Sequence, residues 1–448
     1  MTRHFPLGSF TTADFFPVRA GTRSGGQGRQ ERRVLIVVEN LPVPLDRRVW
    51  LEATTLVANG YQVSVICPTG RGWDAPYEVL EGVHIYRYPE PVEAHSGALA
   101  YAREYGHALW HMVRLARKVR RERGFDVIQG CNPPDLIFLV ALVYRLFGVR
   151  YLFDHHDVSP ELFEAKFAKR GWLYRMMRLW ERMSFATASV SIATNESFRR
   201  IALGRGRMRR EDVFVVRSAP KVEKFEIRPP DPALRKGAKT VLGYVGVIGQ
   251  QEGMDLLVAA VDLLVRRMGR DDLHAVIVGF GPHLPEVQKD VAARGLDAHF
   301  TFTGALYGDA LLAALNSCDI GVSPDPKNAM NDISTMNKVM EYMTLEKPVV
   351  QFDLAEGRAS AGEAALYAAA NDAGDFAAKI AWLIDHPEEG RRMGRIGRAR
   401  VFDALSWAHS VPNLLAAYDR IFAKQQARRA AARGQVADRF ALQAAGQE

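Results

Sequence analysis

One stretch of the chain combines a buried-helix pattern with polar side chains that burial does not explain. The stretch reads NDISTMNKVMEYMTLEKPVV, residues 331–350, and its Met, Val and Leu positions are typical of an apolar helix face. If Ser334 caps this helix, the amides of the next three residues are free to bind phosphate, and Lys338 adds a full charge. Those three residues are Thr335, Met336 and Asn337.

Glu341 lies two turns into the same expected helix. Side chains lean toward the helix N-terminus, so its carboxylate can accept hydrogen bonds from the two hydroxyls of a ribose. The layout therefore suits a nucleoside diphosphate. A purely structural interpretation stays open, in which Lys338 and Glu341 pair at i, i+3 on a solvated face.

A second polar group, DHHD at residues 154–157, follows the apolar run RYLFD. Ser159 and Pro160 are typical of an N-cap and a first helical residue, so the four side chains lie at the end of a strand. Asp154, His155, His156 and Asp157 can form an active site or a polar turn. Four consecutive residues on an extended chain cannot all face one ion, so a metal site is disfavoured.

Glycines follow two further expected strands, in GYVGVIG (243–249) and VGFGP (278–282). Gly246 and Gly249 allow a ligand to approach the backbone closely, although tight turns explain them equally well. Neither run is a G-x-G-x-x-G followed at the right distance by a ribose-binding acid, and no phosphate-loop motif occurs. A nicotinamide cofactor is therefore not expected.

The elements that must position these groups alternate between strands and helices. In the first half, strands are expected at 33–38, 61–68, 83–88, 126–130, 150–154 and 188–194. In the second half, they are expected at 239–249, 273–282, 299–303, 318–323 and 347–352. Alternation of this kind predicts an α/β fold with two doubly wound parallel sheets, which are Rossmann-like domains facing across a cleft.

The domain boundaries follow from composition. We expect a mobile leader at 1–32, domains at 33–220 and 239–405, and a Pro-rich linker at 221–238. An amphipathic helix should occupy 406–424 and a fraying tail 425–448. The longest apolar run, 136–148, is too short to span a bilayer and reads as a buried helix.

Charge and cysteine usage narrow the setting. The 448-residue chain has a net charge of +8, with basic runs at 111–124 and 166–185. Its three cysteines, Cys67, Cys131 and Cys318, show no metal spacing and suggest buried thiols in a reducing compartment. No secretory signal is evident, so a cytoplasmic protein is expected. A nucleic-acid partner is not expected, because the basic runs lack a recognised fold or stacking aromatics.

Residues 171–185 place large apolar side chains on one helical stripe and three arginines on another. This pattern fits a core-facing helix with a basic solvated face, or a helix that lies on an anionic membrane surface. The apolar stripe comprises Trp172, Met176, Leu179, Trp180 and Met183, and the arginines are Arg175, Arg178 and Arg182.

Over residues 33–423 the chain resembles the family 4 glycosyltransferases, which are retaining enzymes of the GT-B fold that use sugar nucleotides. The most specific segments point to the subgroup that builds bacterial surface polysaccharides. They are VENLPVPLDRRVW (38–50), FDHHDVSPELF (153–163), IATNESFRRIA (192–202), VFVVRSAP (213–220) and STMNKVMEYMTLEKPVVQFD (334–353).

The resemblance assigns roles to several residues. Glu341 matches the acid that holds the donor ribose, and Gly304 begins the segment expected beside the nucleobase. His156 is the best match to the histidine that lines the sugar site, and His155 is the second choice.

Two departures stand out. The family's earlier glutamate is replaced by Ile333, with Asp332 beside it, and the run GVIGQQEG (246–253) lacks the usual basic diphosphate clamp. Lys338, the helix amides, and Arg217 or Lys327 would have to compensate.

The resemblance implies a nucleotide-sugar donor, with a UDP-sugar favoured, and a glycan or lipid-linked acceptor near the inner membrane face. Helix amides and Lys338 would stabilise the leaving diphosphate, which would take the acceptor's proton on the same face. No D-x-D lies near the site, so no metal and no cofactor are expected. Two other functions stay open, a nucleotide-sugar epimerase and a non-catalytic nucleotide-sugar-binding subunit.

Overall fold

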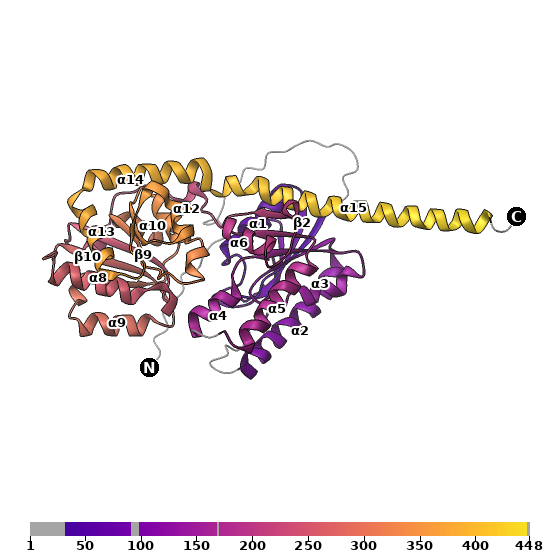
Figure 1. Ribbon diagram of the computed structural model, residues 1–448, viewed down its shortest axis with the longest axis horizontal. Helices are drawn as coiled ribbons and strands as arrows, with labels where there is room; N and C mark the ends of the chain where they lie inside the picture. Colours follow the sequence, from indigo (N-terminus) through magenta and orange to yellow (C-terminus); the bar gives the residue numbers. More distant parts are fainter. Residues whose placement is uncertain (1–31, 91–97, 168–169, 446–448) are drawn as a thin grey trace.

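The computed structural model describes residues 32–90, 98–167 and 170–445. Two α/β domains lie side by side, and a long helix from the second domain runs back over the first (Figure 1). Of the expected leader at 1–32, residues 1–31 lie outside the described residues, and Arg32 belongs to the first strand.

The first domain is built on an eight-stranded sheet in the order β3-β4-β2-β1-β5-β6-β7-β8. All neighbouring strands run parallel except β3, which pairs antiparallel with β4 at the edge. The strands are β1 Arg32–Val37, β2 Tyr61–Pro68, β3 Tyr77–Leu80, β4 Val83–Tyr88, β5 Val127–Cys131, β6 Arg150–His155, β7 Val190–Ala193 and β8 Val213–Val215.

Helices cover both faces of this sheet. Core residues of α2, α3 and α5 pack on one face, and those of α1 and α15 pack on the other. The helices of the first domain are α1 Arg47–Ala58, α2 Ala98–Glu122, α3 Phe138–Arg145, α4 Ser159–Phe167, α5 Trp172–Thr187 and α6 Glu196–Leu203.

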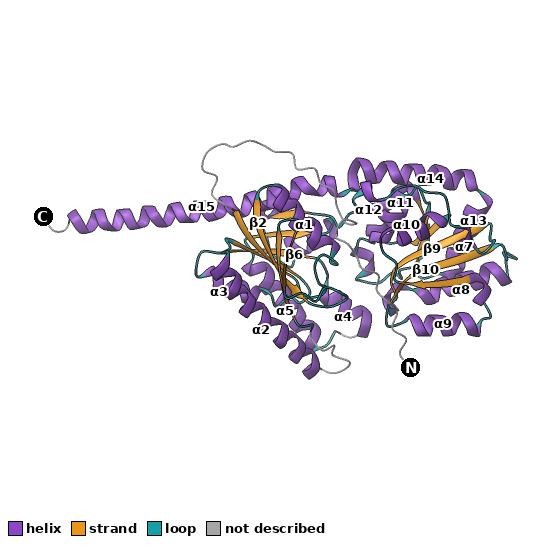
Figure 2. Ribbon diagram, turned by 180° about the vertical axis from the view of Figure 1, so that it is seen from behind, coloured by secondary structure: helices purple, strands orange, loops and turns teal. Residues whose placement is uncertain are grey.

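The second domain has a six-stranded parallel sheet in the order β11-β10-β9-β12-β13-β14. Helices flank the strands of this sheet (Figure 2). The strands are β9 Thr240–Val247, β10 Leu273–Phe280, β11 Phe300–Gly304, β12 Ile320–Ser323, β13 Val349–Phe352 and β14 Ala365–Ala368. Side chains of α8, α9 and α13 pack on one face, and those of α10 and α11 pack on the other.

The remaining helices complete the second domain and the return of the chain to the first. They are α7 Pro232–Arg235, α8 Met254–Arg266, α9 Leu284–Ala293, α10 Gly308–Ser317, α11 Asn337–Thr344, α12 Ala355–Ala361, α13 Ala373–Asp385, α14 Pro387–Arg400 and α15 Trp407–Ala445. Short 3-10 turns include η4 Gln250–Glu252 and η6 Asn331–Ile333.

The predicted α/β class and the two parallel sheets are confirmed. Three strands were not anticipated, namely β3, β8 and β14. Each has only three or four residues, and the Ala-rich β14 lacks the β-branched residues that identify a strand. β3 alternates between exposed and half-buried side chains, as an edge strand does.

Helix α15 ties the two domains together. It begins at Trp407 and continues to Ala445, so the helix does not end at 424 as the sequence suggested. Its buried side chains join the core of the first domain, and Trp407 Nε1 donates to Thr55 Oγ1 at 2.9 Å. The residues that join this core are Trp407, Leu414, Ala417, Tyr418, Ile421 and Phe422.

All three cysteines are buried free thiols, as expected.

Two predictions concern helices and membranes. Over the ranges described, none of the helices is both long and apolar enough to cross a bilayer. The helix expected at 136–148 forms as α3, but it is not fully buried, since Leu146 and Phe147 at its end are 86% and 67% exposed.

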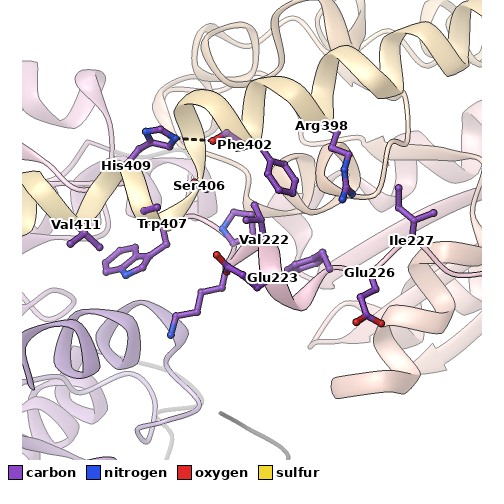
Figure 3. A pocket seen from close by; sticks show the side chains of 14 residues that line it. Val222, Glu223, Glu226, Ile227, Arg398, Phe402, Ser406, Trp407, His409 and Val411 are labelled. Carbon is purple, nitrogen blue, oxygen red and sulfur yellow. Dashed lines mark hydrogen bonds between the residues drawn. The ribbon is translucent and has the colours of Figure 1, made fainter. Parts of the chain in front are cut away.

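A cavity of about 900 Å³ lies where the linker passes beneath the turn from α14 to α15 (Figure 3). Val222, Ile227, Phe402 and Trp407 line it, and the ring of His409 bonds the Phe402 carbonyl. None of the predicted site residues lines this cavity, so it is distinct from the site described next.

Candidate active site

The helix that carries Glu341 begins later than expected. α11 starts at Asn337, and Met336 occupies the cap position without a side-chain hydrogen bond. Ser334 is therefore not the N-cap. Its hydroxyl donates to the Met330 carbonyl at 2.7 Å, because the preceding turn η6 brings that carbonyl within reach. The amides at the helix start thus belong to the residues from Asn337 onward.

Lys338 is not an unpaired charge. Its ammonium lies 2.8 and 3.0 Å from the carboxylate oxygens of Asp325 and 3.2 Å from Glu252. It also lies 4.8 Å from the centre of the Tyr244 ring. Burial favours the neutral amine, but Asp325 and these other neighbours keep the pKa of Lys338 above its ordinary value. Asp325 and Glu252 are therefore already the partners of the charge expected to face a phosphate.

Glu341 pairs with a residue of the other domain. Arg47, the first residue of α1, places Nη1 2.8 Å from Glu341 Oε1. The Glu341 side chain is 6% exposed and that of Arg47 is 70% exposed. The alternative of a solvated Lys338–Glu341 pair is wrong, because both side chains are buried and each has another partner. Glu341 thus sits at the boundary between the domains.

The first domain contributes a buried acid, Asp154, at the end of β6. Its Oδ1 accepts from Arg48 Nη2 at 2.7 Å, and its Oδ2 lies 2.7 Å from Nε2 of His156. Burial raises the pKa of Asp154, but the charges of Arg48 and His156 outweigh it and hold that pKa well below its usual range. Asp154 is therefore an anion that orients the His156 ring.

Further polar groups surround Asp154 without access to solvent. Gln129 Nε2 donates to Asp154 Oδ2 at 2.9 Å and to Glu52 Oε2 at 2.6 Å, and the Tyr418 hydroxyl of α15 donates to Gln129. Burial and the nearby Asp154 charge raise the pKa of Glu52 well above its ordinary value. The buried carboxyl of Glu52 is thus neutral beside the charged carboxylate of Asp154.

His156 and His155 point into different environments. His156 is 13% exposed, and its backbone amide donates to Asn132 Oδ1 at 2.6 Å. His155 is fully buried among aromatic rings, including Phe153 and Phe185, and lies 3.6 Å from Glu181. The second-choice assignment of His155 to the sugar site is therefore wrong, because alternation along β6 turns it into the core.

A metal ion is a separate question. Cys131, Asp154 and His156 place one potential ligand atom each within 4.8 Å of one another. Arg48, however, already contacts Asp154, and a cation would sit beside its guanidinium charge. Burial raises the pKa of Cys131 well above its usual value, so the thiolate that binds metals is disfavoured. These residues do not fit a cation.

The other predicted donor residues lie around α11 and the strand ends. Gly246 has a φ of 156°, and a Cβ added there would lie 3.7 Å from Cε of Lys338. Gly249 has an ordinary extended φ, and its space is filled by Gln251. Gly304 has a φ of 73° and open space around it. Asp332 accepts from the Ala355 amide at 2.9 Å, which anchors α12.

Contacts between the domains involve residues that the sequence did not assign. Asn195 caps α6 and donates to the Ile333 carbonyl at 2.9 Å and to Thr335 Oγ1 at 3.0 Å. Arg47 was also missed as a single residue. Asn195 lies in segment 192–202 and Arg47 in segment 38–50, two of the segments that carried the family resemblance. Their membership of these segments is the sequence feature that could have identified them.

Family comparisons cover both domains. Residues 45–219 match the model described as "Glycosyl transferase 4-like domain", and residues 239–386 match "Glycosyl transferases group 1". The chain belongs to the GT-B glycosyltransferases. Together the two matches take in Arg47, Asp154 and His156 of the first domain and Lys338 and Glu341 of the second, whereas Tyr418 of α15 lies outside both.

Curated relatives of this glycosyltransferase include several sugar transferases. The alpha-D-kanosaminyltransferase of Streptomyces kanamyceticus is 27% identical over 279 residues, 59% of this chain and 68% of that protein. The GDP-mannose-dependent alpha-mannosyltransferase of Corynebacterium glutamicum is 31% identical over 281 residues, 60% of each chain.

Solved structures share the fold of this glycosyltransferase at low identity. Sucrose-phosphate synthase from Thermosynechococcus elongatus has a TM-score of 0.71 at 17% identity, covering 88% of this chain and 100% of that one. WaaG, a glycosyltransferase involved in lipopolysaccharide biosynthesis, has a TM-score of 0.64 at 14% identity, covering 85% and 98%. At these identities the likeness concerns the fold.

Proposed function

We propose that the enzyme transfers a sugar, with retention, from a nucleotide-diphosphate sugar to a glycan or lipid-linked acceptor. A hexosyl or N-acetylhexosaminyl group from a UDP-sugar is the favoured donor group. The observation that carries the proposal is the position of Glu341, a buried carboxylate on α11 that faces the first domain and is reached there by Arg47. Vicinal ribose hydroxyls are two adjacent donors that suit such a carboxylate.

The surroundings of Glu341 fit the rest of a donor. The start of α11 supplies amides near one side, and Gly246 leaves the backbone accessible beside Lys338. The ring of His156, held by Asp154, is the polar group offered by the first domain. In this arrangement the sugar lies between the domains, and the leaving diphosphate accepts the acceptor's proton on the departing face.

The curated relatives agree with a sugar-nucleotide reaction. One is named for its dependence on GDP-mannose, and others are named for kanosaminyl and glucosyl transfer.

The surface of the first domain supports contact with the inner face of a membrane. Exposed apolar side chains on α2, α3 and α5 occur beside exposed arginines on the same helices. Of the two alternatives for the apolar stripe of α5, the core-facing one is disfavoured, because Trp172, Leu179 and Met183 are exposed. The buried residues of this helix include Glu181, Ser184 and Phe185. The exposed apolar residues on these helices include Trp110, Leu142, Trp172 and Leu179, and Leu146 and Phe147 follow directly after α3.

Calorimetry with UDP, GDP, dTDP and ADP tests the donor site. One diphosphate should bind, and Glu341→Ala should weaken it by about 10- to 100-fold, the usual value of a hydrogen bond to a charged group. Glu363→Ala is the matched control, because that carboxylate is 81% exposed. Binding that is indifferent to Glu341 would make α11 structural and remove the proposal's support.

Product analysis tests the reaction itself. With the matching nucleotide sugar and a lipid-linked acceptor, NMR should show a new glycosidic bond with the anomeric configuration of the donor. An isomerised sugar without transfer would indicate an epimerase. Binding without turnover, across a panel of acceptors, would indicate a non-catalytic subunit.

A further inference from the structure

The diphosphate of a nucleotide sugar carries two negative charges. Among the described residues of the site, the lysines expected to bind it already pair with acidic side chains. The segment after β9, residues 248–253, contains no basic residue and instead carries Glu252. A diphosphate leaving group needs positive charge in the transition state, since its charge rises as the anomeric bond breaks. The site must therefore obtain this charge from another part of the chain.

Lys338 cannot supply it without losing partners. Its ammonium is held by Asp325 and Glu252, and its side chain is only 8% exposed. Lys327 is also engaged, with its ammonium 3.1 Å from the Asp353 carbonyl and 3.3 Å from Asp332. Both lysines thus hold the second domain's own loops together.

Arg47 differs from these lysines in exposure and in the number of its partners. Among the described residues its ion-pair partner is Glu341 alone, and its side chain is largely exposed. The backbone that carries it is fixed, because Asp46 caps α1 and the adjacent Arg48 is anchored to Asp154 and the Val216 carbonyl. A rigid base with a long exposed side chain allows the guanidinium to change partners.

The contact with Glu341 places the Arg47 guanidinium close to the position that the α-phosphate of a donor would occupy if its ribose binds Glu341. A ribose that binds Glu341 takes the carboxylate oxygen that Arg47 now contacts. The α-phosphate is attached to that ribose through C5′, so it lies within a rotation of the terminal bonds of the Arg47 side chain. A guanidinium binds phosphate oxygens through two parallel hydrogen bonds, a geometry that an ammonium cannot match.

We infer that Arg47 of the first domain is the donor-diphosphate ligand, and that it exchanges Glu341 for the diphosphate when the ribose binds. The inference rests on the proposed function, and it gives the missing clamp a source in the opposite domain. Arg47 then joins the two domains through Glu341 without donor and through the donor's phosphates with it.

Two measurements on one variant distinguish this role from a structural one. Without Arg47, a nucleoside loses a competitor for Glu341 and should bind as well as before or better. A nucleoside diphosphate should instead lose about 10- to 100-fold in affinity, as expected for a charge-assisted hydrogen-bond pair. The readout is therefore the ratio of the two dissociation constants.

The experiment uses the full chain, with UDP and uridine, and with GDP and guanosine in parallel. Calorimetry is done on wild type, Arg47→Ala, Arg47→Gln and Arg47→Lys, with thermal melts to check folding. Arg267→Ala is the control for loss of one exposed charge. Arg217→Ala tests the other candidate, since Arg217 Nη1 is buried without a hydrogen-bond partner among the described residues.

The ratio of the nucleoside's dissociation constant to that of the diphosphate should fall strongly in Arg47→Ala and Arg47→Gln. It should recover in part in Arg47→Lys and stay unchanged in Arg267→Ala. A ratio that stays at the wild-type value in both neutral variants, or that collapses only in Arg217→Ala, overturns the inference. If Glu341→Ala still weakens the nucleoside in that case, the proposed function stands alone. If no diphosphate binds to wild type, both proposals fall.

Discussion

Nε2 of His156 lies 2.7 Å from Oδ2 of Asp154, and Arg48 holds the other oxygen of that carboxylate at the same distance. His156, the histidine that we propose lines the sugar site, is therefore anchored to a buried anion whose charge is balanced by Arg48. This relationship makes Asp154 a positioning residue, and it sets the first prediction.

Asp154→Asn should lower the free energy of unfolding by about 2–4 kcal/mol, because it leaves Arg48 buried without its closest anion. The loss is moderated by Glu52, which can ionise once the Asp154 charge is removed. Since the pKa of Asp154 is depressed in the fold, its contribution is present at pH 7 and is lost only on acidification below the unfolded value.

Urea denaturation at pH 7 measures this effect. Asp309→Asn is the control, because Asp309 is 88% exposed and should change stability by no more than about 0.5 kcal/mol. Equal stability of the two variants would contradict the anchored role of Asp154.

Glu252→Gln should alter how stability depends on pH. Burial raises the pKa of Glu252 to about 7, against the attraction of Lys338. The folded protein therefore holds this proton more tightly than the unfolded chain, and the contribution of Glu252 to stability falls as pH rises from about 4.5 to 7. Glutamine cannot titrate, so the variant should gain on the order of 2 kcal/mol relative to wild type between pH 5 and pH 8.

Chemical denaturation of both proteins at several pH values checks this sign. The difference between variant and wild type is the relevant quantity, since burial also raises the pKa of Asp135 to about 7 and adds a similar slope to both proteins. A difference that is constant across this range would show that Glu252 does not titrate there.

Leu414→Ala should destabilise the first domain, although Leu414 belongs to the final helix. The side chain is fully buried in the core beneath α1 and the sheet, and truncation of such a leucine costs about 2–5 kcal/mol. Leu415→Ala, at a half-buried neighbouring position, should cost less. Hydrogen exchange in β1 and β2 should rise in the first variant, and exchange confined to α15 would argue against a shared core.

Vesicle binding should depend on the arginines of α5. Neutralising three of them should weaken binding to anionic vesicles by about 100-fold, at about 1 kcal/mol per charge near the surface, and flatten its salt dependence. Co-sedimentation at low salt is the measurement. If the control variant weakens vesicle binding equally, α5 is not the membrane-binding surface. The variant is Arg175, Arg178 and Arg182 to Gln, and the control is Arg391, Arg392 and Arg395 to Gln on α14.

Turnover should persist after treatment with EDTA. A cation at Asp154 would lie beside the positive charge of Arg48, which already pairs with that carboxylate. In addition, no D-x-D segment lies near Glu341. The check is the rate of sugar transfer with EDTA and after addition of Mg²⁺ or Mn²⁺. A rate abolished by EDTA and restored by either ion would refute metal independence.

Local patterns in the sequence were sufficient for the architecture and for part of the site. Alternation of β-branched strands with amphipathic helices predicts two parallel sheets, because the periods of 2 and 3.6 residues are local properties. The polar groups DHHD and Glu341 stand out for the same reason, since burial alone does not account for their residue types. The short strands β8 and β14 were missed because three or four residues carry too little periodicity.

The partners of the charged residues were decided only by tertiary structure. Spacing along the helix suggested that Lys338 and Glu341 pair, but Lys338 pairs with Asp325 and Glu341 with Arg47, which is 294 positions away. Likewise, the sequence left open which face of α5 is buried, and the fold leaves Trp172, Leu179 and Met183 of the apolar stripe exposed. Electrostatic and packing energies depend on distance in space and on burial, and neither is encoded in the spacing of residues along one element.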